Sequence, residues 1–155
     1  MYKRVAVIFL LLGFGLAFAS GPGPRDETCS AVVHALNLKL PEKIDEAELV
    51  HILMSLKTAR WLPATFVSKA QARSLGWKPG QDLWKNKKLY GKSIGGDRFQ
   101  NREKKLPNIK HVYYEADLDY KGGKRNAKRL IFTREGRCYV TVDHYQTFTE
   151  VPPCR

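Results

Sequence analysis

Two candidate strands carry acidic and basic side chains that could act together on one substrate. Apolar and polar residues alternate over residues 112–119, which predicts a strand with Glu115 and Asp117 on its polar face. The next candidate strand places Arg125 and Arg129 on one face, and the Gly-Gly pair between the strands predicts a hairpin. The acids would then face the arginines across the strand pair. On charge alone, the same residues could form only a solvated salt-bridge patch.

A histidine near the end of the chain favours chemistry over a surface patch. His144 follows a candidate strand at residues 139–142 and precedes an aromatic residue. A carboxylate, a histidine and several cations are the groups needed to cleave RNA by internal transfer. A base takes the proton of the 2′-OH, an acid protonates the departing 5′ oxygen, and cations stabilise the phosphorane. DNA lacks the 2′-OH and would not react.

This chemistry requires no nucleophile from the protein, because the attacking oxygen belongs to the substrate. We therefore expect no cofactor. The four histidines do not show metal-ligand spacing, so we also expect no metal site.

The charge of the chain agrees with a polyanionic substrate. The 155 residues include 27 Lys and Arg against 15 Asp and Glu, a formal net charge of +12. A charge of this size indicates attraction to nucleic acid, an anionic surface or an acidic protein, and carries no information about fold. Single-stranded RNA is the expected partner. A non-catalytic RNA-binding module remains the alternative reading.

The first 19 residues have the pattern of an export signal. Lys3 and Arg4 precede an apolar run that ends in an Ala-x-Ala cleavage signature at Ala19, so a mature chain would begin near Ser20. The run is short for a membrane-spanning helix and contains two glycines. We expect a secreted or periplasmic monomer that has no membrane contact after cleavage. Its charge would be 25 − 15 = +10 once Lys3 and Arg4 are removed.

Three cysteines follow the export signal, and an exported chain can form disulfides. Cys138 has the parity of two valines in its strand, which predicts a buried free thiol on the apolar face. Cys29 and Cys154 lie at the two ends of the domain and form the natural pair.

Helix signals precede strand signals along the chain. Residues 20–43 are expected to form an extended leader, and residues 44–155 a single domain. Capping boxes begin at Asp45 and Ser68, and Asp82 could cap a further turn. Strand patterns follow from Ile94 onward, separated by turn residues. This order predicts an α+β fold, with N-terminal helices packed on a twisted antiparallel sheet of about five strands.

Several of these segments carry a family resemblance. The runs Gly-Lys-Ser-Ile-Gly-Gly-Asp-Arg-Phe-Gln-Asn-Arg-Glu (residues 91–103), Glu-Ala-Asp (115–117) and Asp-His-Tyr-Gln-Thr-Phe-Thr (143–149) resemble the barnase-like family of extracellular guanyl-preferring bacterial ribonucleases. The resemblance covers residues 62–149 in one order, with small length changes. It implies an endoribonuclease that cleaves single-stranded RNA on the 3′ side of guanosine through a 2′,3′-cyclic phosphate.

The resemblance also implies a role for each matching residue. Glu115 corresponds to the general base and His144 to the general acid, and Asp117 to a buried acid that holds the arginines. The cations around the scissile phosphate correspond to Lys69, Arg125 and Arg129. The guanine-binding loop corresponds to Phe99, Gln100, Asn101, Arg102 and Glu103. Tyr145 corresponds to an aromatic residue at the phosphate and base site.

Some positions depart from the family pattern. Gln100 replaces a serine, and Lys124 and Lys128 replace an aromatic residue and an acid beside the arginines. These changes leave the catalytic groups intact and bear on subsite preference. The family further suggests an acidic, barstar-like inhibitor protein as a partner. The same chemistry would also suit an intercellular toxin.

Overall fold

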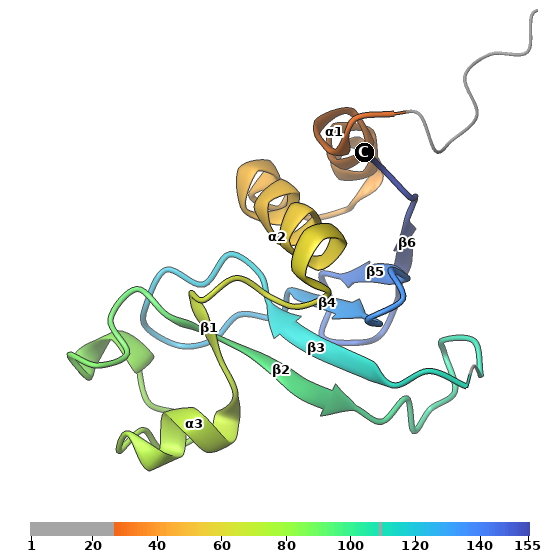
Figure 1. The fold of residues 1–155 in the computed structure, drawn as a ribbon. Helices are drawn as coiled ribbons and strands as arrows, with labels where there is room; N and C mark the ends of the chain where they lie inside the picture. Colours follow the sequence, from red (N-terminus) through yellow and green to blue (C-terminus); the bar gives the residue numbers. More distant parts are fainter. Residues whose placement is uncertain (1–26, 109) are drawn as a thin grey trace, which may run out of the picture.

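A computed structural model describes residues 27–108 and 110–155, and it has the expected α+β architecture (Figure 1). The export signal and its cleavage position lie outside these residues. The elements are α1 (Cys29–Lys39), α2 (Glu46–Ala59), β1 (Phe66–Val67), α3 (Lys69–Ser74), the 3-10 helix η1 (Leu83–Lys85), β2 (Ser93–Phe99), β3 (Tyr113–Asp117), β4 (Arg129–Phe132), β5 (Cys138–Thr141) and β6 (Thr149–Val151).

The prediction of an extended leader over residues 20–43 is wrong for residues 29–39, which form α1. Thr28 caps this helix by accepting a hydrogen bond from the Ala31 amide, and Val32, Val33 and Leu36 are buried. Their spacing is that of an amphipathic helix. The helix packs against α2 and β6, so it belongs to the core of the domain.

The predicted caps of the other helices are confirmed. Asp45 accepts from the Glu48 amide at the start of α2, although the Glu48 carboxylate accepts from the Asp119 amide and does not close the box. Ser68 and Gln71 form a complete capping box at α3. Asp82 caps η1.

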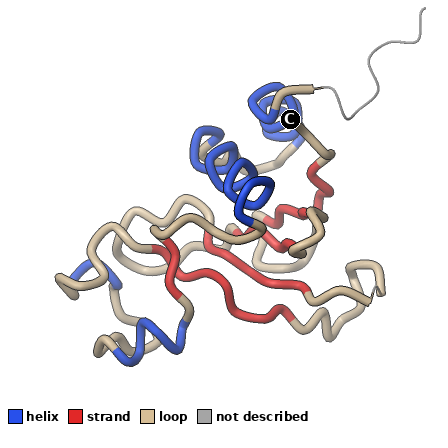
Figure 2. The backbone as a smooth tube through the Cα atoms, viewed as in Figure 1, coloured by secondary structure: helices blue, strands red, loops and turns tan. Residues whose placement is uncertain are grey.

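The sheet has six strands in the order β1-β2-β3-β4-β5-β6, one more than expected. It is also mixed, because β1 pairs with β2 in parallel and the other pairs are antiparallel. The close approach of β1 depends on Gly95, where an added Cβ would lie 2.6 Å from the Phe66 ring and 2.9 Å from the Leu62 side chain. Figure 2 shows the strands as one curved layer, with long loops at its edges.

Alternation within the strands is confirmed, but the polar face of β3 is also covered. Ala116 and Leu118 face the core under α1 and α2 together with Leu130 and Phe132. On the opposite face, an apolar cluster contains Leu106, Tyr113, Ile131 and Tyr139, with Phe99, Tyr145 and Phe148 packed against it. Loops therefore bury the face that carries the predicted site.

The predicted cysteine arrangement is confirmed. Cys29 and Cys154 form a disulfide across a sequence separation of 125 residues, and Cys138 is free and buried. Burial raises the pKa of the Cys138 thiol to about 12, which makes it unreactive at neutral pH. Within residues 27–108 and 110–155, no helix is long and apolar enough to cross a membrane.

Candidate active site

A carboxylate in the middle of the sheet holds the site together. Glu115 on β3 is 8% exposed and accepts hydrogen bonds from two side chains of distant segments. The Lys69 ammonium lies 2.6 Å from Oε1, and the Tyr145 hydroxyl donates to Oε2 at 2.7 Å. Both carboxylate oxygens are thus oriented by groups from α3 and from the turn after β5. Burial, followed by the charge of Glu115, raises the pKa of Tyr145, so its hydroxyl stays protonated as a donor.

The position of Lys69 follows from how α3 begins. Ser68 caps the helix, and the backbone amide of Lys69 donates to Oδ2 of Asp97 on β2 at 2.9 Å. Asp97 lies opposite Glu115 in the β2–β3 register. A cation in the first helical turn opposes the helix dipole, a small local cost that the contact with Glu115 offsets. The contact of Asp97 with the helix was not foreseen from the sequence.

A second buried acid holds both arginines. Asp117 is 2% exposed and accepts from Nε and Nη2 of Arg125 at 2.6 Å each, a bidentate pair. This hydrogen bonding raises the pKa of Arg125, whose charge is therefore permanent. Arg129 Nε lies 3.0 Å from Asp117 Oδ1, within ion-pair distance but not aligned for a hydrogen bond. The supporting role expected for Asp117 agrees with this geometry.

The turn after β5 presents its two aromatic rings in an unusual backbone conformation. His144 and Tyr145 both have positive φ, at 55° and 71°, which non-glycine residues seldom adopt. Asp143 stabilises the turn by accepting from the side chains of Thr141 and Thr147 and from the amides of Gln146 and Thr147. Desolvation opposes the charged carboxylate, but these hydrogen bonds outweigh it and lower the pKa of Asp143 to about 2.

His144 is exposed and does not line the cavity of the guanine-loop residues. Its ring is 4.9 Å from the Tyr145 ring, and its backbone amide donates to the Ala127 carbonyl. With Arg125 and Arg129 it lines a hollow of about 350 Å³. Among the residues that the structure describes, no side chain is hydrogen-bonded to the His144 ring. The ring is free to meet a ligand in that hollow.

The predicted guanine loop and Glu115 share one cavity. This cavity of about 530 Å³ is lined by Phe99 to Glu103, Lys69, Glu115 and Tyr145, with Arg98, Lys105 and Phe148 completing its wall. Phe99 stacks on Tyr145 with ring centroids 5.5 Å apart. The Glu103 carboxylate is largely exposed and pairs with Lys105 at 2.8 Å. The loop, Glu115 and Lys69 thus line one cavity, whereas Arg125, Arg129 and His144 line another hollow.

Lys105 was not among the predicted site residues, but the structure gives it specific contacts. Besides Glu103, its ammonium contacts the backbone carbonyl of Tyr145 at 3.1 Å. It therefore joins the loop to the turn that carries His144. Phe148, at 6.1 Å from the Phe99 ring, was also missed, although it belongs to the quoted 143–149 run.

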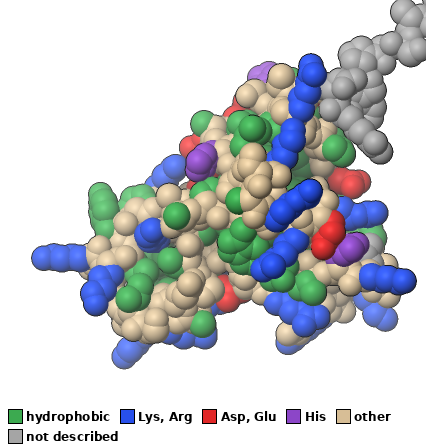
Figure 3. Space-filling model, viewed as in Figure 1, with side chains coloured by type: hydrophobic (Ala, Val, Ile, Leu, Met, Phe, Trp, Pro, Cys, Tyr) green, Lys and Arg blue, Asp and Glu red, His purple; other side chains and the backbone are tan. Residues whose placement is uncertain are grey.

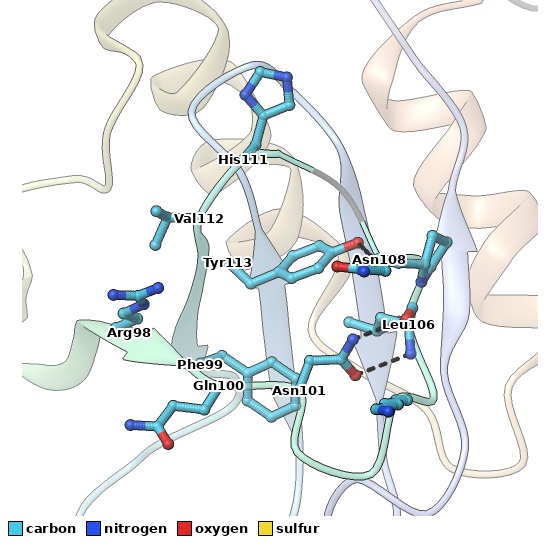
Figure 4. Close-up of a pocket in the computed structure, with 11 residues that line it drawn as sticks. Arg98, Phe99, Gln100, Asn101, Leu106, Asn108, His111, Val112 and Tyr113 are labelled. Atoms are coloured by element: carbon cyan, nitrogen blue, oxygen red, sulfur yellow. Dashed lines mark hydrogen bonds between the residues drawn. The ribbon is translucent and has the colours of Figure 1, made fainter.

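A larger hollow of about 660 Å³ lies behind the loop, and Figure 4 shows its wall. The Asn101 side chain bonds to both the amide and the carbonyl of Leu106, which closes the loop into a compact turn. Lys69, Glu115 and Tyr145 do not line this hollow. We therefore assign the candidate site to the smaller cavity, which Glu115, Lys69 and Tyr145 line.

The face of the molecule drawn in Figure 3 is strongly basic. Figure 3 shows many Lys and Arg side chains and few acidic ones on the visible face. In the described ranges 27–108 and 110–155, no three His, Cys, Asp or Glu side chains come close enough together to hold a metal ion.

Comparison with known proteins places the chain in a family. A family model described as ribonuclease matches residues 54–152, which is well over half of the chain. The chain belongs to this ribonuclease family. Every residue of the site described above falls within the matched range, whereas α1 and both disulfide cysteines fall outside it.

Individual relatives agree with this membership. Ribonucleases of Bacillus intermedius and Bacillus pumilus are each 43% identical over 91 residues, covering 58% of this chain and 56% of theirs. A ribonuclease of Heyndrickxia coagulans is 42% identical over 91 residues, which cover 58% of this chain and 83% of that protein. The chain thus spans little more than half the length of the two Bacillus relatives.

Proposed function

We propose that this protein is an endoribonuclease that cleaves single-stranded RNA on the 3′ side of guanosine, through a 2′,3′-cyclic phosphate. One observation carries the proposal. The Glu115 carboxylate, oriented by Lys69 and Tyr145, lies in the same cavity as the loop of residues 99–103. A base bound by that loop would bring its own ribose and 3′ phosphate toward Glu115.

In the first step, Glu115 removes the proton of the ribose 2′-OH, and the oxygen attacks the adjacent phosphorus. Lys69, Arg125 and Arg129 stabilise the negative charge of the phosphorane. His144, whose ring lies 4.9 Å from that of Tyr145, donates a proton to the departing 5′ oxygen. The cyclic phosphate is then hydrolysed by water with the two roles reversed. Glu115 and His144 line separate hollows, so the base and the acid would act on different oxygens of the substrate.

Guanine selectivity would come from the loop. Guanine presents two adjacent donors, N1–H and N2–H, together with the acceptors O6 and N7. Glu103 would accept from the donors, and backbone amides of the loop would meet the acceptors. Asn101, held by its two bonds to Leu106 and with φ at 46°, fixes the loop in a shape that can point amides inward.

We propose that the enzyme acts outside the cell, after removal of residues 1–19. The disulfide supports this location, because such bonds persist in oxidising compartments. An acidic inhibitor protein would fit the same basic cleft, and a use as an intercellular toxin would involve the same chemistry.

Product analysis on a short RNA with a single guanosine tests the proposal. We expect one cut, after G, that gives a fragment ending in a 2′,3′-cyclic phosphate, detected by mass spectrometry. Activity should persist with a chelator and be absent on the matching DNA. Tight RNA binding without any cleavage would favour the non-catalytic alternative. Cleavage after all four bases at similar rates would contradict the role of the loop.

A further inference from the structure

A hollow lies on the face of the sheet that α2 covers, which is the face opposite to the candidate site. It has a volume of about 350 Å³ and lies between the end of α2, the β4–β5 turn and the segment after β6. Its floor is apolar, because Leu53, Leu56 and Val151 belong to the core cluster under the helices. It shares no lining residue with the two hollows of the candidate site. We call it the α2-end hollow.

The α2-end hollow is open to solvent at the β4–β5 turn. Gly136 in this turn has φ at 102°, and a Cβ added there would meet no atom within 4 Å. Two exposed prolines, Pro152 and Pro153, form another part of the wall. A volume of about 350 Å³ lies within the range of roughly 300–1,000 Å³ that is typical of sites for small organic groups. A single nucleobase therefore fits.

Cations surround the opening of the hollow. Lys57 and Arg60 at the end of α2 and Arg137 in the turn line it, and all three are exposed. None of them forms an ion pair with another residue of the ranges 27–108 and 110–155. The acid in the wall, Glu135, lies 3.2 Å from His111. The carbonyls at the end of α2 oppose an anion by only about half a charge, so the opening is positive overall.

Arg134 adds a fourth cation beside Arg60. Its guanidinium carbon lies 4.5 Å from the centroid of the Trp61 ring and 5.6 Å from that of the Tyr114 ring. Stacking on aromatic rings fixes the plane of a guanidinium and leaves its N–H groups able to donate to a phosphate. Figure 3 shows Lys and Arg side chains over the end of α2 and the strands beside it. Like charges gathered in this way repel one another, and a bound anion would relieve the repulsion.

Single-stranded RNA matches both properties of the hollow. It offers an unstacked base to an apolar surface and carries phosphates on both sides of that base. An acidic peptide would satisfy the cations, but the chain belongs to a ribonuclease family, so RNA is the polyanion on which it acts.

We propose that the α2-end hollow is a second binding site for single-stranded RNA, separate from the site of cleavage. One base enters the hollow, and the neighbouring phosphates contact Lys57, Arg60 and Arg134. This inference rests on the proposed function in that RNA is the substrate, and it adds a site that holds a distant part of the same strand. A long RNA that occupies both sites binds more tightly than a short one.

A tetraadenylate with 2′-O-methyl groups tests the site, because it has no 2′-OH and cannot be cleaved. The wild-type protein is first saturated with guanosine 3′-monophosphate, which occupies the candidate active site. Titration with the tetraadenylate is then followed by methyl NMR. We expect the methyl signals of Leu53, Leu56 and Val151 to shift to higher field, since a base ring lies against them.

The variant Lys57→Ala/Arg60→Asn removes two of the cations. Asn is chosen at position 60 because Arg60 has φ at 57°, a conformation that Asn tolerates. We expect the dissociation constant of the tetraadenylate to rise about five- to tenfold, the size of two exposed charge pairs. The log–log dependence of binding on salt should become shallower by about 1.4, which corresponds to two phosphates at about 0.7 each. The ratio of kcat/KM on a long RNA with one guanosine to kcat/KM on the dinucleotide GpA should fall.

The matched control is Lys39→Ala/Lys78→Ala, which removes two exposed lysines that do not line the hollow. It should keep the wild-type affinity. Unchanged methyl signals, displacement of the tetraadenylate by guanosine 3′-monophosphate, or an equal loss in the control would overturn the inference. So would hepta-glutamate binding in the hollow where the tetraadenylate does not. Failure of the wild-type protein to cleave GpA would instead contradict the proposed function, because the NMR titration does not depend on cleavage.

Discussion

Two segments that are distant in sequence converge on Glu115. It lies on β3, receives a cation from α3 and a hydroxyl from the turn after β5, and faces the cavity of the guanine loop. A glutamate placed only to balance charge would not need both of its oxygens fixed by separate segments. This arrangement argues for a carboxylate whose orientation matters.

Replacing Glu115 by Gln should lower kcat/KM on GpA by about 10²–10⁴-fold, the range for loss of a general base. The amide is isosteric and cannot take the proton of the 2′-OH. Steady-state kinetics on the purified variant measures the loss, and circular dichroism should show an unchanged fold.

Glu150→Gln is a matched control, because Glu150 is an exposed glutamate on β6. It should retain wild-type kinetics. Near-normal turnover of Glu115→Gln would remove this residue from the role of base.

In the wild type, the plot of kcat/KM against pH should be bell-shaped, since the proposed mechanism needs an ionised Glu115 and a protonated His144.

Asp143 acts on stability through its charge. Because its folded-state pKa is lowered to about 2 from an ordinary value of 3.8, its contribution is fully present above about pH 4 and is lost as pH falls through about 2. Asp143→Asn should therefore unfold at a lower urea concentration than the wild type at pH 5. The difference should shrink steadily between pH 4 and pH 2. A difference that does not depend on pH would mean that the geometry of the Asp143 side chain, and not its charge, stabilises the turn.

At the scale of elements, the loop of residues 99–103 and the turn of residues 143–149 behave as a unit. Lys105 contacts both, and Phe99 stacks on Tyr145. Changes in the loop should therefore affect base selection directly and turnover only through these contacts.

Glu103→Ala should reduce the preference for guanosine over other nucleosides by roughly 10- to 100-fold, the range for loss of a base-specific pair. Cleavage of dinucleotides with other bases should change much less. Parallel kinetics on GpA, ApA, CpA and UpA measures this. Glu135→Ala removes an exposed acid from the β4–β5 turn and should keep the preference. An equal loss on all four substrates would assign Glu103 a structural role.

The sequence predicted the elements that carry their own signals. The caps at Asp45, Ser68 and Asp82 follow from side chains within three residues of the helix start, and they are confirmed. By contrast, β1 is two residues long and exists only because it pairs with distant β2. The α1 helix had an apolar period of three and four residues, but the preceding Gly-Pro run favoured an extended segment.

The candidate site, like the fold, was predicted only where a motif or a local pattern indicated it. Motifs identified Glu115, Asp117 and the arginines, and alternation placed the two acids and Arg129 on one face. The strand position predicted for Arg125 is wrong, because β4 begins at Arg129 and Arg125 lies in the loop before it. Alternation could not reveal that loops bury this face, nor that Asp97 fixes the start of α3, because both depend on tertiary contacts.

At the scale of the whole molecule, the disulfide connects α1 to the last residues of the chain. Replacing Cys29 and Cys154 by Ser should lower the free energy of unfolding by up to about 4–5 kcal/mol, because the bond closes a loop of more than 100 residues. Urea denaturation of the oxidised wild type and of the double variant measures the loss.

Activity of the double variant under native conditions is the control, since the site residues lie neither in α1 nor in the last residues of the chain, which the disulfide joins. It should match the wild type at low temperature. An unchanged free energy of unfolding would mean that the helices alone hold the two ends in place.

Backbone hydrogen bonds beside the disulfide also join the two ends of the described chain. The Arg155 amide donates to the Glu27 carbonyl, and the Cys29 amide donates to the Arg155 carbonyl, each at 2.9 Å. A short peptide linker could therefore join these positions, and the exposed turn at Gly136 could be opened in its place. In such a circular permutant, the backbone itself would connect the two ends that the disulfide joins. This connection would therefore persist in a reducing cytosol.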